Sequence, residues 1–302
     1  LEWFRTTQAA HLIAPALTAA IWRALEEGAD INGRFSATLP YQPPRLDANA
    51  NDEIAWNQEF LTVVLDASHS LETVRQSPDV SQANSVIGLD AWPSKYLWEQ
   101  NVHPEVDISQ VLSRRERQLW RRIERGLQVV QVGDNPRPRS GDNACEWFDQ
   151  GGTTALAAAI REEFGAELTT GITTTQVEEP FEEALVSAGA MPEEVVTRHF
   201  GTEKGVNEFA DENAGLVVGS MDPGDDYVLN LLAEAGLSAE PETETCPDCD
   251  GDGCDECDYT GVYRKHGREF TGSDADAAED ILETVREQHV AQAAGRYARN
   301  AD

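Results

Sequence analysis

Four of the five cysteines lie in one short run, Cys246-Pro247-Asp248-Cys249-Asp250-Gly251-Asp252-Gly253-Cys254-Asp255-Glu256-Cys257. Each Cys-x-x-Cys pair can bind one ion with two thiolates, and four sulfurs form a closed tetrahedral shell at about 2.3 Å from Zn²⁺. The glycines between the pairs allow tight turns in which backbone N–H groups point at sulfur. Because a closed shell leaves no open coordination position, the spacing predicts a structural zinc. Iron in the same geometry, or an iron–sulfur cluster, is the alternative. The predicted ligands are Cys246, Cys249, Cys254 and Cys257.

The segment Cys246–Gly253 resembles the CxxCxGxG repeat of J-domain co-chaperones. The second pair lacks the first glycine of that repeat, and the sequence contains no J domain, so a chaperone is not expected. The fifth cysteine, Cys145, stands alone and is predicted to be a small packed side chain.

A second candidate is basic. A helix predicted over 109–125 carries six arginines, of which Arg114, Arg117, Arg121 and Arg125 share one face. Such a face can follow a line of phosphates. The alternative is a solvated helix whose arginines pair with the surplus carboxylates of this chain.

The third candidate lies near the end of the sequence, in Gln292-Ala293-Ala294-Gly295-Arg296-Tyr297-Ala298-Arg299. Arg296 and Arg299 are three residues apart and can reach one anion together. The pattern QxxGRxxR resembles motif VI of superfamily 2 helicases, on the second RecA-like lobe. The resemblance implies that Arg296, Arg299 and Gln292 are catalytic and act on ATP and Mg²⁺ held by the first lobe.

Further stretches resemble the motifs of that family in the expected order. The resemblance implies DNA or RNA as a partner and Lys204, Asn207 and Thr173 as residues that bind it. The stretches are Val64–Ser68 (motif III), Ala155–Phe164 followed by Gly171–Thr174 (motif IV), His199–Phe209 (the FGxxxGxNxF stretch of some plasmid- and virus-encoded helicases) and Leu216–Ser220 (motif V).

The nucleotide-binding elements of the first lobe do not occur in this sequence. A P-loop needs Gly-Lys-Ser/Thr, and none of the lysines (Lys95, Lys204 and Lys265) has that context. No Asp-Glu pair follows an apolar strand either. We therefore expect a P-loop-bearing lobe upstream in a longer protein, on another subunit, or lost. The sequence predicts the C-terminal motor lobe of a helicase- or translocase-type ATPase. One alternative is a zinc-stabilised nucleic-acid- or protein-binding adaptor without ATPase activity; another is a regulatory or structural protein of a mobile element.

The composition is strongly acidic, with a formal net charge of −32 and 26% charged residues. An acidic, lysine-poor chain resembles proteins from salt-saturated cytoplasm. At about 1 M salt the Debye length is near 3 Å, so the overall charge does not exclude nucleic acid. The acids are spread through periodic segments, which argues against an acidic disordered tail. No apolar run approaches the roughly 18 residues of a membrane span and no signal peptide is found, so we expect a cytoplasmic location.

Hydrophobic periodicity predicts an α/β fold, with a parallel sheet covered by helices on both faces. The predicted arrangement is the C-terminal part of a first RecA-like lobe over 1–125, then a second lobe over 126–302 with a zinc-knuckle insertion over 241–267. The other predictions are helices over 7–27, 177–188, 227–235 and 274–294, an irregular connection over 28–58, and strands over 61–68, 85–91, 127–132 and 195–199.

Overall fold

The computed structural model places most of the chain in two compact units. Unit 1 comprises residues 1–108 and 224–282, and unit 2 comprises residues 109–223 and 283–302. Each unit is thus formed by two separate stretches of the chain. The sequence predicts instead a single boundary after residue 125. The division into two RecA-like lobes remains a prediction. The structure describes residues 13–28, 30–41, 59–76, 78, 80, 83–90, 92–103, 105–133, 144–164, 168–257, 259–264 and 268–298.

Unit 1 contains a four-stranded antiparallel sheet in the order β1-β2-β3-β4. Its first hairpin turns at Asn32 and Gly33, whose φ angles are 53° and 74°. Asn-Gly suits a two-residue hairpin turn that needs positive φ at both positions. The irregular connection expected over 28–58 is therefore wrong for 30–41, and 42–58 lie outside the described residues. The strands are β1 (Asp30–Ile31), β2 (Arg34–Tyr41), β3 (Glu59–Leu65) and β4 (Leu71–Gln76).

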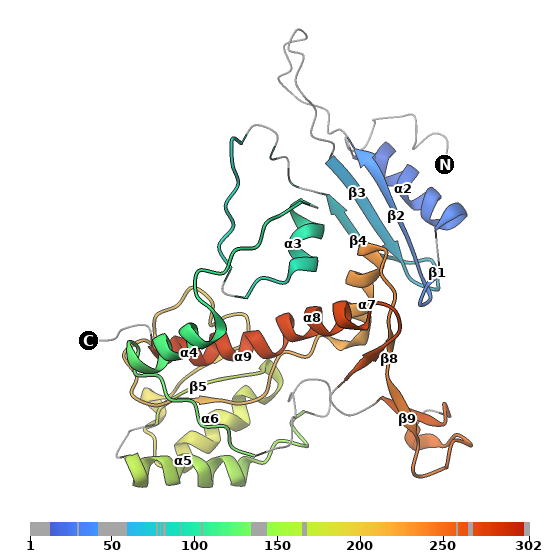
Figure 1. Ribbon diagram of the computed structural model, residues 1–302. Coiled ribbons are helices and arrows are strands. Elements are labelled where there is room, and N and C mark those ends of the chain that lie inside the picture. Colours follow the sequence, from blue (N-terminus) through green and yellow to red (C-terminus); the bar gives the residue numbers. More distant parts are fainter. Residues whose placement is uncertain are drawn as a thin grey trace. The chain divides into compact units, whose positions relative to one another are not determined.

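One helix, α2 (Ala14–Glu27), packs on this sheet (Figure 1). Ala20 and Ala24 are fully buried against Leu61 and Val63 of β3. Small residues on the helix let its backbone approach the sheet closely. The helix predicted over 7–27 is thus confirmed over 14–27, and 7–12 lie outside the described residues.

Two strand predictions in this unit need correction. Residues 61–68 do contain a strand, but β3 pairs with both neighbours antiparallel, so this segment does not end at the edge of a parallel sheet. Asp66 instead organises the turn into β4, accepting a hydrogen bond from the Ser70 backbone N–H at 2.7 Å. Residues 85–90 form no strand in the described part of the chain.

A second core of unit 1 joins three helices. Leu232 of α7 and Ile281 of α8 are almost completely buried there, and Leu97 of α3 packs against them. The elements are α3 (Lys95–Asn101), α7 (Gly224–Ala235), α8 (Ala275–Val285) and the short antiparallel pair β8 (Glu240–Pro241) with β11 (Phe270–Thr271).

Unit 2 contains a three-stranded parallel sheet in the order β6-β5-β7. The predicted mixed α/β class with a parallel sheet is confirmed to this extent. The strands are β5 (Thr170–Thr173), β6 (Val196–His199) and β7 (Leu216–Val217); the helices are α4 (Arg114–Ile123), α5 (Gln150–Phe164), α6 (Glu178–Ser187) and α9 (Glu287–Ala294), with 3-10 turns η1 (Thr175–Val177), η2 (Pro192–Glu194) and η4 (Gly295–Ala298).

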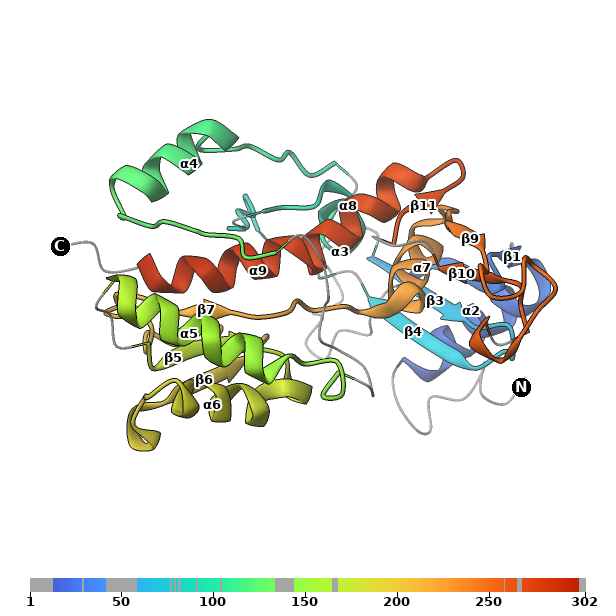
Figure 2. The same cartoon turned by 90° about the horizontal axis from the view of Figure 1, so that it is seen from below.

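The two faces of this sheet are covered by different helices (Figure 2). Side chains alternate between faces along a strand. Leu216 joins the core that includes Phe181 of α6 and Ala157 of α5. Its neighbour Val217 joins the opposite core, with Ala293 of α9. Helices on both faces are what the sequence predicts for a parallel sheet.

The strand expected over 127–132 is wrong: these residues form no strand, and Val129, Val130 and Val132 are exposed. The helix expected over 274–294 is confirmed over 275–285 and 287–294, but it is divided into α8 and α9 at Arg286, which has φ −97° and ψ −72°. Hydrophobic periodicity continues across such a break, because both helices keep an apolar face.

Candidate functional site

The four cysteines lie at the end of a hairpin in unit 1. Its strands are β9 (Thr243–Thr245) and β10 (Val262–Arg264), which pair antiparallel. The Cys246 backbone N–H donates to the Gly261 carbonyl at 2.9 Å and closes the loop that holds all four thiols. Cys257 ends the short 3-10 turn η3 (Asp255–Cys257).

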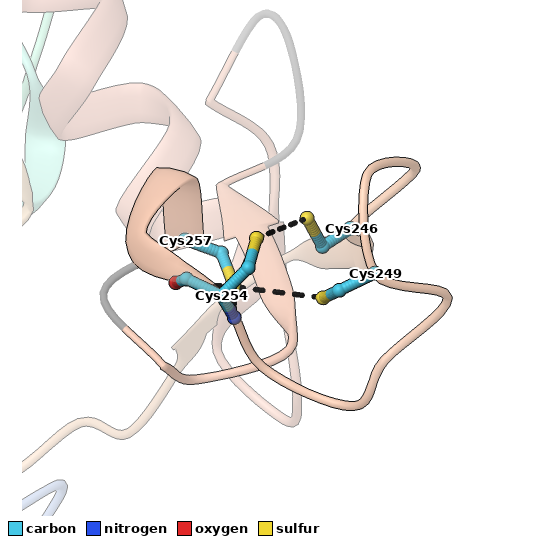
Figure 3. A group of neighbouring side chains, drawn as sticks. All are labelled: Cys246, Cys249, Cys254 and Cys257. Atoms are coloured by element: carbon cyan, nitrogen blue, oxygen red, sulfur yellow. Dashed lines mark hydrogen bonds between the residues drawn. The ribbon is translucent and has the colours of Figure 1, made fainter.

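The four sulfurs face one another (Figure 3). The distance from Cys246 Sγ to Cys254 Sγ is 3.8 Å, from Cys249 Sγ to Cys257 Sγ 3.8 Å, and from Cys254 Sγ to Cys257 Sγ 3.7 Å. A tetrahedron with zinc–sulfur bonds of 2.3 Å has edges of about 3.8 Å. All four ligand atoms lie within 4.8 Å of one another, and the cysteines are free thiols. The donor set therefore fits one tetrahedral metal ion and is compatible with structural zinc.

Backbone N–H groups point at the sulfurs. Gly253 N–H donates to Cys249 Sγ at 3.2 Å, and Gly261 N–H donates to Cys257 Sγ at 3.3 Å. A third donor, Cys254 N–H, lies 3.3 Å from Cys257 Sγ. Hydrogen bonds, first from Cys254 and then from Gly261, lower the pKa of the Cys257 thiol to about 6, against the opposing effect of burial. These contacts favour the thiolate, the form that binds metal.

The loop consists of two equivalent knuckles of eight residues. Cys246–Gly253 and Cys254–Gly261 each end on a glycine that donates to the second cysteine of its own knuckle. Both glycines have positive φ, 89° at Gly253 and 76° at Gly261. A Cβ on Gly261 would lie 2.4 Å from the Gly251 carbonyl oxygen, so glycine is needed there for space as well. The sequence shows the second pair without the first glycine of the CxxCxGxG repeat, and the structure shows that the two knuckles nevertheless share the spacing of seven residues from the first cysteine to the last glycine.

The base of the hairpin is fixed to α7. Asp225, in the first turn of α7, accepts hydrogen bonds from Arg264 Nε at 2.9 Å and from Arg268 Nη2 at 2.7 Å. The Arg264 guanidinium also lies 4.9 Å from the centroid of the Phe270 ring. Charge-assisted contacts of this kind orient the hairpin on unit 1.

The second candidate site is the carboxyl edge of the parallel sheet in unit 2. In α/β folds, ligands bind outside the carboxyl ends of the strands. The Thr173 hydroxyl, at the end of β5, is fully buried and donates to the Val218 carbonyl at 3.0 Å, so it links β5 to the segment after β7. Lys204 and Asn207 are exposed in the loop after β6. Thr173 thus lies inside this edge of the sheet, whereas Lys204 and Asn207 lie on the surface of the loop that follows β6.

The loop after β6 is anchored by both its phenylalanines and one acid. Phe200 and Phe209 are buried in the core formed with α9. Glu203 is fully buried, and its Oε2 accepts a hydrogen bond from the Gly201 N–H. Beside it, Lys204 Nζ lies 3.3 Å from His289 Nε2 of α9. Glu203 and His289 belong to no spaced motif, so the sequence alone does not single them out.

The helix that carries the QxxGRxxR pattern runs across the sheet in the direction opposite to the strands. At its start, His289 Nδ1 lies 2.7 Å from Met221 Sδ, beyond the carboxyl end of β7. Past its end, the Tyr297 ring packs on Gly215, immediately before β7 begins; a Cβ on Gly215 would lie 2.0 Å from Tyr297 Cε1. Residues 289 and 296 are about 10 Å apart along such a helix. Arg296 and the Lys204 edge are therefore at opposite ends of α9.

The predicted catalytic residues have different surroundings. Gln292 is half-buried in α9, while Arg296, in η4, is only 9% exposed. Tyr297 packs against Phe209 with 5.4 Å between ring centroids, which agrees with a packing role. Arg299 lies outside the described residues.

Cys145 corrects one prediction. It is exposed, and its Sγ donates to the Gln176 carbonyl at 2.6 Å. The side chain that is buried at this point of the chain is that of the neighbouring Ala144, which is 1% exposed.

Comparison with known proteins gives no relative: no family model, no curated protein and no solved structure matches this chain. Within the described residues, no helix is both long and apolar enough to cross a membrane.

Proposed function

We propose that this chain is the C-terminal motor lobe of a nucleic-acid helicase- or translocase-type ATPase, completed by a lobe that carries a P-loop. The observation that carries the proposal is the packing of the QxxGRxxR segment against a parallel sheet whose strands β5 and β7 lie in the segments that resemble motifs IV and V. Ala293 and Tyr297 belong to the core that also contains Ile172 of β5. Segments far apart in sequence, each resembling a helicase motif, contribute to one core.

In this proposal the two ends of α9 have different partners. Lys204 and Asn207, on the loop that follows β6, contact the nucleic-acid backbone. Arg296 and Arg299, at the other end, contact the nucleotide bound by the P-loop lobe. Gln292 orients the attacking water or the phosphate. An arginine aimed at the γ-phosphoryl stabilises negative charge that grows in the transition state.

The cysteine site has a separate role. Zinc held by four thiolates would be structural, because the closed shell has no position for substrate. It would fix the hairpin that Asp225 connects to α7.

The test is to combine the chain with the P-loop lobe and compare Arg296→Lys and Arg299→Lys with wild type. Lysine keeps the charge but loses the planar fork. We expect kcat for nucleic-acid-stimulated ATP hydrolysis to fall by about 10³-fold or more, while nucleic-acid binding is retained. Arg286→Lys is the matched control, because Arg286 pairs with its neighbour Glu287 at 2.5 Å. Unchanged kcat in both variants, with folding intact, would reject the catalytic assignment.

A second candidate function is a zinc-stabilised adaptor without ATPase activity. It is favoured by the burial of Arg296 and by the lack of a Gly-Lys-Ser/Thr sequence in these 302 residues. Nucleic-acid binding by the combined lobes without ATP hydrolysis would support the adaptor.

A further inference from the structure

An exposed basic helix in unit 2 stands outside both sites described above. The helix α4 has no buried residue. Residues 113–125 contain six arginines and two glutamates, a formal charge of +4 within a chain of −32. The helix therefore concentrates positive charge where the rest of the chain is acidic.

Three of the arginines of α4 form no ion pair with the surplus acids in the part of the chain that the structure describes. In the described part of the chain, no carboxylate forms an ion pair with Arg114, Arg115 or Arg122, and all three are exposed. Glu116, the acidic residue within the helix, caps its N-terminus. The Glu116 Oε2 accepts a hydrogen bond from the Ser113 N–H at 2.8 Å in a capping box. This cap stabilises the helix without tertiary packing. The alternative given by the sequence, a solvated helix whose arginines pair with surplus carboxylates, therefore does not account for these three arginines.

An apolar stripe adjoins the basic one. At 100° per residue, Leu119, Trp120 and Ile123 fall on the side of the helix away from Arg114 and are 45%, 42% and 69% exposed. The Arg125 guanidinium lies 4.8 Å from the centroid of the Trp120 ring. The guanidinium stacks on one face of the indole, so a planar cationic group lies beside an apolar surface.

We infer that α4 is a docking surface for single-stranded nucleic acid. Phosphates complement the arginines: Arg115 and Arg122 are both exposed and lie two helical turns, about 10 Å, apart. Unpaired bases complement the stripe of Leu119, Trp120 and Ile123, because aromatic and apolar side chains stack on bases of any sequence. A duplex offers the phosphates but hides the base faces, so the combination of the two stripes favours a single strand. The inference extends the proposed function, since it adds a binding surface to those at the sheet edge.

The test measures binding of a fluorescent oligothymidylate to the full chain by anisotropy, from about 0.2 to 1 M KCl. Arg114→Ala/Arg115→Ala/Arg122→Ala should weaken binding by about 10-fold or more at the lowest salt. It should also reduce the slope of log K against log salt by about 2, because each lost phosphate contact on a single strand removes about 0.7. The corresponding triple lysine variant should keep the slope. The control Arg23→Ala/Arg198→Ala/Arg286→Ala makes the same change in net charge elsewhere and should have a smaller effect.

The apolar stripe is tested separately. Trp120→Leu should weaken binding by about 5-fold or more without changing the salt slope, because stacking involves no counterion release. Trp147→Leu is the control, since Trp147 is 59% exposed in the same unit but lies outside α4. Circular dichroism confirms that each variant is folded.

Several results would overturn the inference. One is a triple alanine variant that binds no more weakly than the control triple. Another is a duplex of equal length, or polyglutamate, that binds as tightly as the single strand. A third is capture by phosphatidylserine vesicles that depends on α4 while oligonucleotide binding does not. If α4 is dispensable but Lys204→Ala/Asn207→Ala abolishes binding, this inference fails and the proposed function stands. If wild type binds no oligonucleotide, both fail.

Discussion

Tyr259 occupies, in the second cysteine knuckle, the position that Gly251 occupies in the first. Each is two residues after the second cysteine of its knuckle, and both have positive φ, 61° at Tyr259 and 94° at Gly251. The two knuckles thus contain the same backbone turn. In the first it is formed by glycine, which adopts positive φ freely, and in the second by tyrosine, which does not.

Tyr259→Gly should therefore be more stable than Tyr259→Ala, by about 1 kcal/mol in the free energy of unfolding of the metal-loaded protein. Comparing glycine with alanine removes the contribution of the Tyr259 hydroxyl, which donates to Asp255, because both variants lack it. Gly251→Ala should cost a similar amount at the equivalent position. Denaturant unfolding measures all three, and equal stability of the glycine and alanine variants at 259 would contradict the equivalence of the knuckles.

The cysteine site should hold one zinc per chain. Elemental analysis of protein purified at high salt should return close to one equivalent, and Cys254→Ser should lower this value. Cys145→Ser is the matched control, because that thiol lies outside the cluster. Removing the metal should lower the melting temperature, since binding to a closed four-cysteine site contributes several kcal/mol through coupled folding. Full thermal stability of the metal-free protein would rule out a structural role.

The sequence predicts the cysteine cluster well because its chemistry depends on local spacing. Cys246 and Cys257 are only 11 positions apart, so local turns can bring the four sulfurs together without contacts from distant parts of the sequence. The parallel sheet was also predictable, from apolar runs that alternate with helices. The sequence does not predict the antiparallel sheet, because it leaves the partners of β3 open: an apolar strand followed by Asp66 fits either sheet type.

Other features of the sites depend on tertiary packing that no periodicity records. Nothing in the sequence around Arg296 distinguishes an exposed arginine from one that is 9% exposed. The direction of α9 across the sheet is set by contacts distant in sequence, from His289 to Met221 and from Tyr297 to Gly215. Residues 85–90 and 127–132 have strand-like composition without strand pairing, so composition alone did not decide their structure.

Asp225→Asn should loosen the base of the metal hairpin. The change weakens the contacts of one half-buried carboxylate with two guanidinium groups, those of Arg264 and Arg268. Hydrogen bonds to charged groups of this kind contribute about 1–3 kcal/mol, so we expect a loss of that order in the free energy of unfolding. The neighbouring Asp226→Asn is the control: Asp226 also pairs with an arginine, Arg34, but its side chain is 92% exposed. Exposed pairs contribute about 0–1 kcal/mol. Equal effects of the two substitutions would show that Asp225 has no special role at the hairpin base.

The last prediction concerns the stability of unit 2 at mildly acidic pH. Burial, and then the Lys204 ammonium, lower the pKa of His289 below its ordinary value of 6.5, against an opposing effect of Glu203. The unfolded chain then binds a proton more readily than the folded chain. The resulting stability is present above pH 6.5 and is lost as the pH falls through the folded pKa. His289→Gln has no such titration, so the stability difference between wild type and this variant should shrink as the pH falls below 6.5. Lys204→Met removes one cause of the shift, so the pKa of folded His289 should rise toward 6.5 and the stability lost on acidification should be smaller than in wild type. Urea unfolding at a series of pH values measures both effects, and a difference between wild type and His289→Gln that does not vary with pH would show that His289 titrates alike in the two states.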